Sequence, residues 1–197
     1  MKKLVSILHI AFVAALAIFA GTVLYALPAM LTLPRGVRPG LRKLTLQQAA
    51  QQLRATGKYG WDLVEAARAL VAGRMQYCRR NSFDVAGKAF ERGYGYCQQQ
   101  AFALAGLLAS LGFEVQVVQA VRNSFPDGRV GGHAWVRVTI DGESREVDSI
   151  LYDAQARAVT FVPLTKVTGY TPLFRIFAGW GSAAVNAHRY YITGKDL

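Results

Sequence analysis

The hydrophobic pattern of the chain begins with one long apolar segment, Leu4–Leu33, which follows Lys2 and Lys3. A bilayer core requires about 20 apolar residues in a helix, so residues 4–27 are predicted to form a transmembrane helix. A cleavable signal peptide is the alternative, because residues 15–17 read Ala-Leu-Ala, a small-residue cleavage pattern. Cleavage there would leave an apolar remainder, so the pattern favours an uncleaved anchor.

Proline and glycine then interrupt the chain, and residues 34–43 are predicted to be a basic linker between an anchor (1–33) and one folded domain (44–197). The linker carries Arg35, Arg38, Arg42 and Lys43. Basic side chains beside a membrane span gain about 1 kcal/mol each from anionic lipid. A solvated face without a specific partner explains them equally well, and charge counting on the two sides of the span does not fix its orientation.

The apolar positions after the linker recur first with a helical period. Predicted helices cover residues 45–54, 62–73, 84–93 and 97–111, with Thr45, Asp62 and Asp84 as starts. The last helix has the clearest pattern, because Ala101, Leu104 and Leu108 share one face and a glycine follows its end.

The period then changes to that of strands. Residues 113–122, 133–140, 143–150 and 159–164 are predicted strands, 123–132 a loop, and the aromatic tail packs on the domain. Asp141-Gly142 is a strong hairpin signal between the second and third strands. Helices followed by antiparallel strands predict an α+β domain, with N-terminal helices packed on the sheet and a transmembrane helix in front.

Charge changes this picture little. The chain of 197 residues is 52% hydrophobic and carries a net charge of +11, but residues 1–92 hold 14 basic and 4 acidic side chains whereas residues 93–197 hold 9 and 8. The excess is therefore a property of the N-terminal half. Without a phosphate-binding glycine loop or alternating basic and aromatic residues, we expect no nucleic-acid partner.

Two cysteines and three histidines limit the candidate chemistry. Cys97 opens the strongest helix, where unpaired N–H groups and the helix dipole favour a thiolate, although a buried small hydrophobe is the usual role of a free cysteine. Cys78 is expected to pack near the site, while a disulfide with Cys97 would be a redox switch. A zinc site of Cys78, Cys97 and His133 would lack close ligand pairs, so no metal or cofactor is expected.

The hairpin brings a histidine toward a carboxylate. With a two-residue turn, opposing residue numbers sum to 283, which places His133, Trp135 and Asp148 on one face of the sheet. Asp148 is then the diagonal neighbour of His133 and can orient its imidazole. The alternative is an exposed histidine and an unrelated strand aspartate.

These residues also carry a family resemblance. Gly95-Tyr96-Cys97-Gln98-Gln99-Gln100-Ala101, Leu107-Leu108-Ala109-Ser110-Leu111-Gly112-Phe113-Glu114-Val115, His133-Ala134-Trp135-Val136 and Val147-Asp148-Ser149 resemble the transglutaminase-like superfamily over residues 70–150. That family has a papain-like cysteine peptidase fold with a Cys–His–Asp triad in this order. The resemblance implies Cys97 as nucleophile, His133 as general base and acid, and Asp148 as the orienting residue. Residues 98–100 depart from the commoner pattern, which bears on substrate preference.

The sequence therefore predicts a membrane-anchored cysteine enzyme that acts on amide bonds of a protein or peptide through a thioester, with hydrolysis favoured over acyl transfer. The alternative is a non-catalytic transglutaminase-like binding module or scaffold at the membrane. The backbone N–H of Cys97 is a natural oxyanion donor, and Tyr77, Asn81 and Tyr94 are candidates for a second. Expected partners are the substrate and membrane lipid. We expect a single-pass membrane protein with an N-terminal anchor, or an exported protein if the N-terminus is a signal peptide. The sequence does not determine the side of the membrane or the oligomeric state.

Overall fold

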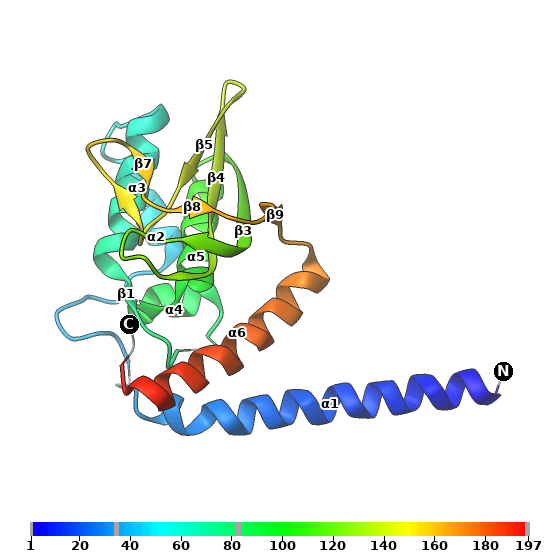
Figure 1. The fold of residues 1–197 in the computed structure, drawn as a ribbon. Coiled ribbons are helices and arrows are strands. Elements are labelled where there is room, and N and C mark those ends of the chain that lie inside the picture. Colours follow the sequence, from blue (N-terminus) through cyan, green and yellow to red (C-terminus); the bar gives the residue numbers. More distant parts are fainter. Residues whose placement is uncertain (1, 34–35, 82–83, 196–197) are drawn as a thin grey trace.

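A computed structural model describes residues 2–33, 36–81 and 84–195 (Figure 1). Its helices are α1 (Lys2–Leu31), α2 (Leu46–Arg54), α3 (Gly60–Arg74), α4 (Ala86–Arg92), α5 (Cys97–Ser110) and α6 (Pro172–Thr193). Its strands are β1 (Gln76–Tyr77), β2 (Tyr94–Gly95), β3 (Glu114–Ser124), β4 (Val130–Ile140), β5 (Glu143–Val147), β6 (Tyr152–Asp153), β7 (Ala158–Val159), β8 (Val162–Pro163) and β9 (Thr168–Gly169).

The N-terminal half of helix α1 extends away from the rest of the protein (Figure 1), and the helix continues through Pro28 to Leu31. Its segment Ser6–Ala29, 24 residues, is long and apolar enough to cross a membrane. Helices of this kind near an N-terminus either span a membrane or serve as signal sequences. The predicted linker follows, and Pro34 and Arg35 lie outside the described residues.

The helix starts follow local capping chemistry in one of three predicted cases. Thr45 caps α2 as predicted, accepting from Gln48 N in a capping box. Helix α3 begins at Gly60, so Asp62 lies in its first turn instead of at the cap and pairs with Arg157 at 2.9 Å. Helix α4 begins at residue 86, because Asp84 is used by the side chain of Arg92 at 2.8 Å.

Gly93 ends α4 in the left-handed conformation, with φ of 80°. A Cβ atom at this position would lie 2.7 Å from Leu41 Cδ1 and 3.1 Å from the carbonyl oxygen of Arg74. Glycine is therefore required both by the backbone angle and by the close approach of the 36–43 segment.

Helix α5 is the central element of the domain. It packs against α2, α3 and α4 on one side and against β3 and β4 on the other. The main core fills both interfaces, with Leu104, Leu107 and Leu108 fully buried and the inward residues of β4 and β5, such as Val136 and Val147, opposite them. This packing fixes the position of the helix start, where Cys97 lies.

The main sheet is antiparallel in the order β5-β4-β3-β8, and β9 also pairs with β3 (Figure 1). The predicted hairpin register is correct from Ile140↔Glu143 to Val136↔Val147, and Asp141 and Gly142 both have positive φ, 51° and 82°. Strand β5 ends at Val147, before the predicted end, because Asp148 uses its side chain in hydrogen bonds outside the ladder.

Two other sheet predictions need correction. The predicted loop 123–132 is shorter, since β3 reaches Ser124 and β4 begins at Val130. The predicted strand 159–164 is divided between β7, which pairs with β6, and β8, which pairs with the end of β3. Period-2 alternation indicates extended chain but does not say which neighbour it pairs with.

The aromatic tail forms a single helix, α6, which begins after the cap Thr171 and runs alongside the C-terminal half of α1 (Figure 1). The Phe19 and Trp180 rings lie 4.7 Å apart, and the Tyr25 hydroxyl is 2.9 Å from Nδ1 of His188. The tail also contacts the domain, as expected, through Tyr170, whose ring lies 5.3 Å from that of Phe102.

Candidate active site

Cys97 lies half-buried at the first position of α5. The short parallel pair of β1 and β2 places Tyr77 opposite Gly95, two residues before the cysteine. Two cavities, of about 590 Å³ and about 330 Å³, are both lined by Cys97, His133 and Tyr77. The thiol, the imidazole and this phenol therefore border the same open space from α5, β4 and β1.

His133 and Asp148 are in direct contact. Nε2 of His133 lies 2.7 Å from Oδ2 of Asp148, and the two side chains are only 5% and 1% exposed. The same carboxylate oxygen accepts a hydrogen bond from the Leu151 N–H at 2.9 Å, which fixes its orientation. The hairpin register predicts that these two residues are diagonal neighbours, and in the structure they lie within hydrogen-bonding distance.

Aromatic rings enclose the imidazole of His133. Phe161 lies edge-on at 4.9 Å and Phe125 at 5.9 Å between centroids, and Trp135 stacks at 6.2 Å. The indole N–H of Trp135 donates to Glu146, so this ring is held in place as a wall. These contacts exclude water from the His133–Asp148 pair and strengthen its electrostatic interaction.

The surroundings of His133 change its pKa in opposite directions. Burial lowers the pKa, but the hydrogen bonds that the imidazole makes with Asp148 and Cys97, together with the electrostatic interaction with both groups, outweigh burial and raise the pKa from its ordinary value of 6.5 to about 10. The imidazole therefore holds its proton at neutral pH. A protonated imidazole beside the thiol is the arrangement that supports a thiolate–imidazolium pair.

This pKa predicts a pH dependence of stability. A histidine whose folded pKa is raised binds its proton more tightly when folded, so its stabilising contribution is complete below pH 6.5 and is lost as the pH rises toward about 10. The slope for one proton is at most about 1.4 kcal/mol per pH unit. Thermal unfolding of the wild type and of Asp148→Asn between pH 6 and 10 measures it. We expect the decline to be much shallower in the variant, and parallel curves would contradict the assignment.

The three glutamines after Cys97 are buried and hold the site together. Gln99 accepts from the N–H of Tyr96 at 3.1 Å and donates to the carbonyl of Asp84 at 2.7 Å. Gln100 donates to Gly95 at 2.9 Å and accepts from the Ser149 hydroxyl at 3.1 Å. The second pair of bonds connects α5, which begins at Cys97, to the residue after Asp148.

The three candidates for a second oxyanion donor have different surroundings. Asn81 donates to the carbonyl of Tyr94 at 2.7 Å, and Tyr94 packs with Leu33 and Cys78. Only Tyr77 of the three lines both cavities with the cysteine among the described residues. Cys78 is buried in that packing cluster, and the two cysteines are not joined in a disulfide.

Sequence reasoning missed the contribution of α6. Phe174, Ser182, Val185 and Arg189 of this helix line the smaller cavity, opposite Cys97. The available signal was helical spacing in the tail, where these positions, with Ala178 between the first two, recur every three or four residues. Local pattern could have identified the helix but not the surface that it covers.

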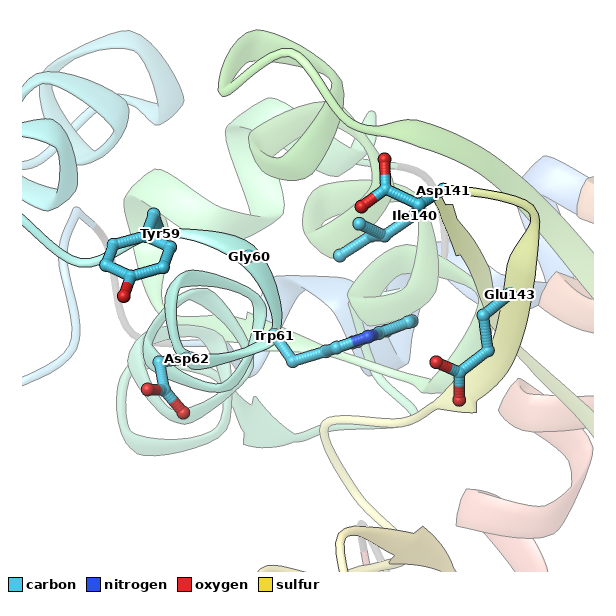
Figure 2. A pocket seen from close by; sticks show the side chains of 7 residues that line it. All are labelled: Tyr59, Gly60, Trp61, Asp62, Ile140, Asp141 and Glu143. Atoms are coloured by element: carbon cyan, nitrogen blue, oxygen red, sulfur yellow. The ribbon is translucent and has the colours of Figure 1, made fainter.

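Another surface pocket, of about 420 Å³, lies at the hairpin end of the sheet (Figure 2). In this pocket Trp61 extends from α3 toward Glu143 of β5, and Asp62 and Asp141 lie nearby (Figure 2). Its lining contains neither cysteine nor histidine, and Asp62 and Glu143 are paired with Arg157 and Arg145. The candidate chemistry therefore lies at the cavities beside Cys97.

Solved structures share features with this chain at low sequence identity. A protein described as a "Putative Cysteine Protease" from Cytophaga hutchinsonii aligns with a TM-score of 0.46 and 13% identity, covering 64% of this chain and 48% of that one. This chain thus spans about half of that relative's length. LapG of Legionella pneumophila aligns with a TM-score of 0.45 and 13% identity, covering 70% of this chain and 94% of that one. A search of curated proteins found no match.

A family model establishes the relationship more directly. The model for the transglutaminase-like superfamily matches residues 47–148, just over half of the chain. The matched segment contains α5 with Cys97, β4 with His133, and ends at Asp148. Together with the helices packed on a curled antiparallel sheet, this match assigns the fold, and the chain belongs to the transglutaminase-like superfamily.

Proposed function

We propose that this protein is a membrane-anchored cysteine enzyme that acts on amide bonds of a protein or peptide through a thioester, with hydrolysis favoured over acyl transfer. The observation that carries the proposal is the pair of His133 and Asp148, 2.7 Å apart beside Cys97. Nucleophile, base and orienting group are the three parts that such chemistry requires.

Each residue has one role in the proposed reaction. The Cys97 sulfur, as thiolate, attacks the amide carbon and a tetrahedral oxyanion forms. His133 then gives its proton to the leaving nitrogen, the C–N bond breaks, and a thioester remains. A water molecule loses a proton to His133 and attacks the thioester, which releases the acid and regenerates the thiolate. Asp148 keeps the imidazole oriented throughout.

The oxyanion has two proposed donors. The N–H of Cys97 lies at the start of α5, where helix N–H groups lack intrahelical partners. The hydroxyl of Tyr77 is the second. Its pKa is raised first by burial and then by the charge of Cys97, so it stays protonated and able to donate.

The residues that follow α1 are packed on the domain, so the proposed anchor is joined directly to the folded part of the chain. Arg80 donates to the carbonyl and the hydroxyl of Thr32 at 3.2 and 3.0 Å, and Leu33 is buried against Cys78 and Tyr94. Cleavage at residues 15–17 would leave these contacts in place, but it would also leave the remaining apolar part of α1 without the first half of the helix. A retained helix keeps both the packing and the membrane span.

Alkylation by limiting iodoacetamide across pH tests the enzyme hypothesis. An ordinary thiol with a pKa of about 8.5 is less than about 1% thiolate at pH 6. A thiolate–imidazolium pair predicts that Cys97 is alkylated at this pH about tenfold faster than in His133→Ala, even though a stabilised thiolate is intrinsically less nucleophilic. Peptide mass spectrometry locates the label.

Cys78 is the internal control, because it is buried and has no part in the proposed reaction. We expect it to react slowly in both proteins. Equal and slow labelling of Cys78 and Cys97 would overturn the enzyme hypothesis and favour the alternative, a transglutaminase-like module that binds a partner at the membrane.

A further inference from the structure

Helix α6 carries an apolar stripe that the proposed reaction does not use. Leu173, Ile176, Phe177, Trp180 and Tyr191 recur at helical spacing and therefore lie along one side of the helix. We call these five residues the α6 stripe. The residues of α6 that line the cavity beside Cys97 lie on another side of the helix. Ile176 and Trp180 of the stripe also border a pocket with Gln98 and Phe102 of the domain.

Helix α1 covers the C-terminal part of the α6 stripe. Trp180 contacts the Phe19 ring, and the Tyr191 hydroxyl donates to the carbonyl of Tyr25 at 2.6 Å, with its ring edge-on at 5.3 Å. The N–H of Ala29 donates to the same hydroxyl at 3.3 Å. The two helices thus run side by side in the same direction from Phe19 to Ala29. Figure 1 shows the C-terminal parts of α1 and α6 next to each other.

The N-terminal part of the α6 stripe has no such cover. Leu173, Ile176 and Phe177 are 70%, 50% and 61% exposed. The one charged side chain between them, Arg175, lies on the opposite side, with its guanidinium 3.8 Å from the centroid of the Phe102 ring. The uncovered surface is therefore apolar and uncharged, while the cation faces the domain.

Helix lengths place this surface at the depth of a bilayer. Residues 2–18 of α1 precede its first ring contact with α6, and at 1.5 Å per residue they extend only about 25 Å. A hydrocarbon core is about 30 Å thick. A membrane span that begins at the start of α1 must therefore continue past Phe19, into the segment that lies beside α6.

We propose that α6 is a second membrane-contacting element, whose α6 stripe lies at the boundary of the hydrocarbon core beside α1. This inference rests on the proposed membrane anchoring. The occupant is lipid, because the exposed stripe is continuous with the exposed apolar surface of α1 and carries no charge. Tryptophan and tyrosine near the contact are the residues typical of such a boundary.

The consequence concerns access to the site. Phe174 and Val185 line the cavity beside Cys97 from the other side of the same helix. A bilayer that holds α6 also holds one wall of this cavity at the membrane surface. The proposed substrate is therefore a polypeptide segment close to the membrane.

Nitroxide accessibility tests the placement. The full chain, with Cys78→Ala and Cys97→Ser to remove native thiols, receives a single spin label at Ile176→Cys and is reconstituted in phosphatidylcholine–phosphatidylglycerol nanodiscs. Collision rates with oxygen, which enters lipid, are compared with those of a water-soluble nickel chelate. We expect oxygen to relax the label at least about threefold more effectively than nickel.

Two matched positions separate the outcomes. Val13→Cys on α1 reports the anchor, and Val162→Cys, 62% exposed on β8, reports water. A lipid signal at 13 with a water signal at 176 would overturn this inference and leave the anchor proposal standing. A water signal at 13 would overturn the anchor itself. Protection of 176 from both reagents would mean a protein partner or a second copy, which also overturns lipid contact.

Discussion

Replacement of Cys97 by serine is expected to reduce turnover of p-nitrophenyl acetate by about 10³-fold or more, in detergent or nanodiscs. This generic ester acylates an activated thiol and releases a coloured phenolate, so no natural substrate is required. A serine hydroxyl beside the same imidazole is a much weaker nucleophile at neutral pH. Stopped-flow absorbance gives the acylation burst, and intact-mass spectrometry detects the acetylated enzyme.

Cys78→Ala is the matched control, because it removes the other thiol from a buried packing cluster. We expect this variant to keep the burst. Loss of the burst in Cys78→Ala with full activity in Cys97→Ser would reverse the assignment of the nucleophile. Equal, slow turnover in all three proteins would leave no catalytic role for either cysteine.

Arg74→Met is expected to lower the free energy of unfolding by about 3 kcal/mol. Arg74 is buried, and its guanidinium donates to the carbonyls of Phe90, Glu91 and Arg42 at 2.8, 2.8 and 3.0 Å. Two of these carbonyls belong to the end of α4, where helix carbonyls lose their usual intrahelical donors, and that of Phe90 also accepts from the N–H of Gly93 at 3.2 Å. Methionine would fill part of the volume and remove the guanidinium donor from all three carbonyls.

Thermal unfolding followed by circular dichroism measures this effect, and a loss of 3 kcal/mol corresponds to a decrease in Tm of about 10 °C for a domain of this size. Lys88→Met is the control, since this side chain is 57% exposed and only weakly paired with Glu91 at 3.7 Å. It is expected to change stability by less than about 0.5 kcal/mol. Similar changes in the two variants would show that Arg74 contributes only as a surface charge does.

Hydrogen bonds from arginines hold the N-terminal part of the chain on the domain. The end of α1 and the 36–43 segment contact the domain through arginines that donate to backbone carbonyls, among them Arg80 to Thr32 and Arg38 to Gly73 at 3.0 Å. This explains part of the high basic content of the N-terminal half without nucleic acid. The guanidinium of Arg38 therefore contacts the domain. The sequence alone offered a lipid contact or a solvated face for this side chain.

Local features of the amino-acid sequence determined much of the fold and the candidate site. Thr45 caps the start of α2, and Gly93 ends α4. These caps and the Asp141-Gly142 turn act on backbone only a few residues away, so their effects could be predicted. The turn in addition fixed the hairpin register, and the register brought His133 near Asp148. The order of the Cys, His and Asp motifs along the chain, which resembles that of the family, added Cys97 to the candidate site.

Long-range packing decided the rest. Tyr77 reaches the cavity because β1 pairs with β2, Arg74 reaches α4 across 16 residues of sequence, and α6 covers the site because its two sides match α1 and the domain. None of these contacts has a sequence period or a turn signal of its own. Periodicity and caps are local, whereas the surface that a side chain meets depends on which distant segments bury each other's apolar faces, and only the tertiary structure decides that.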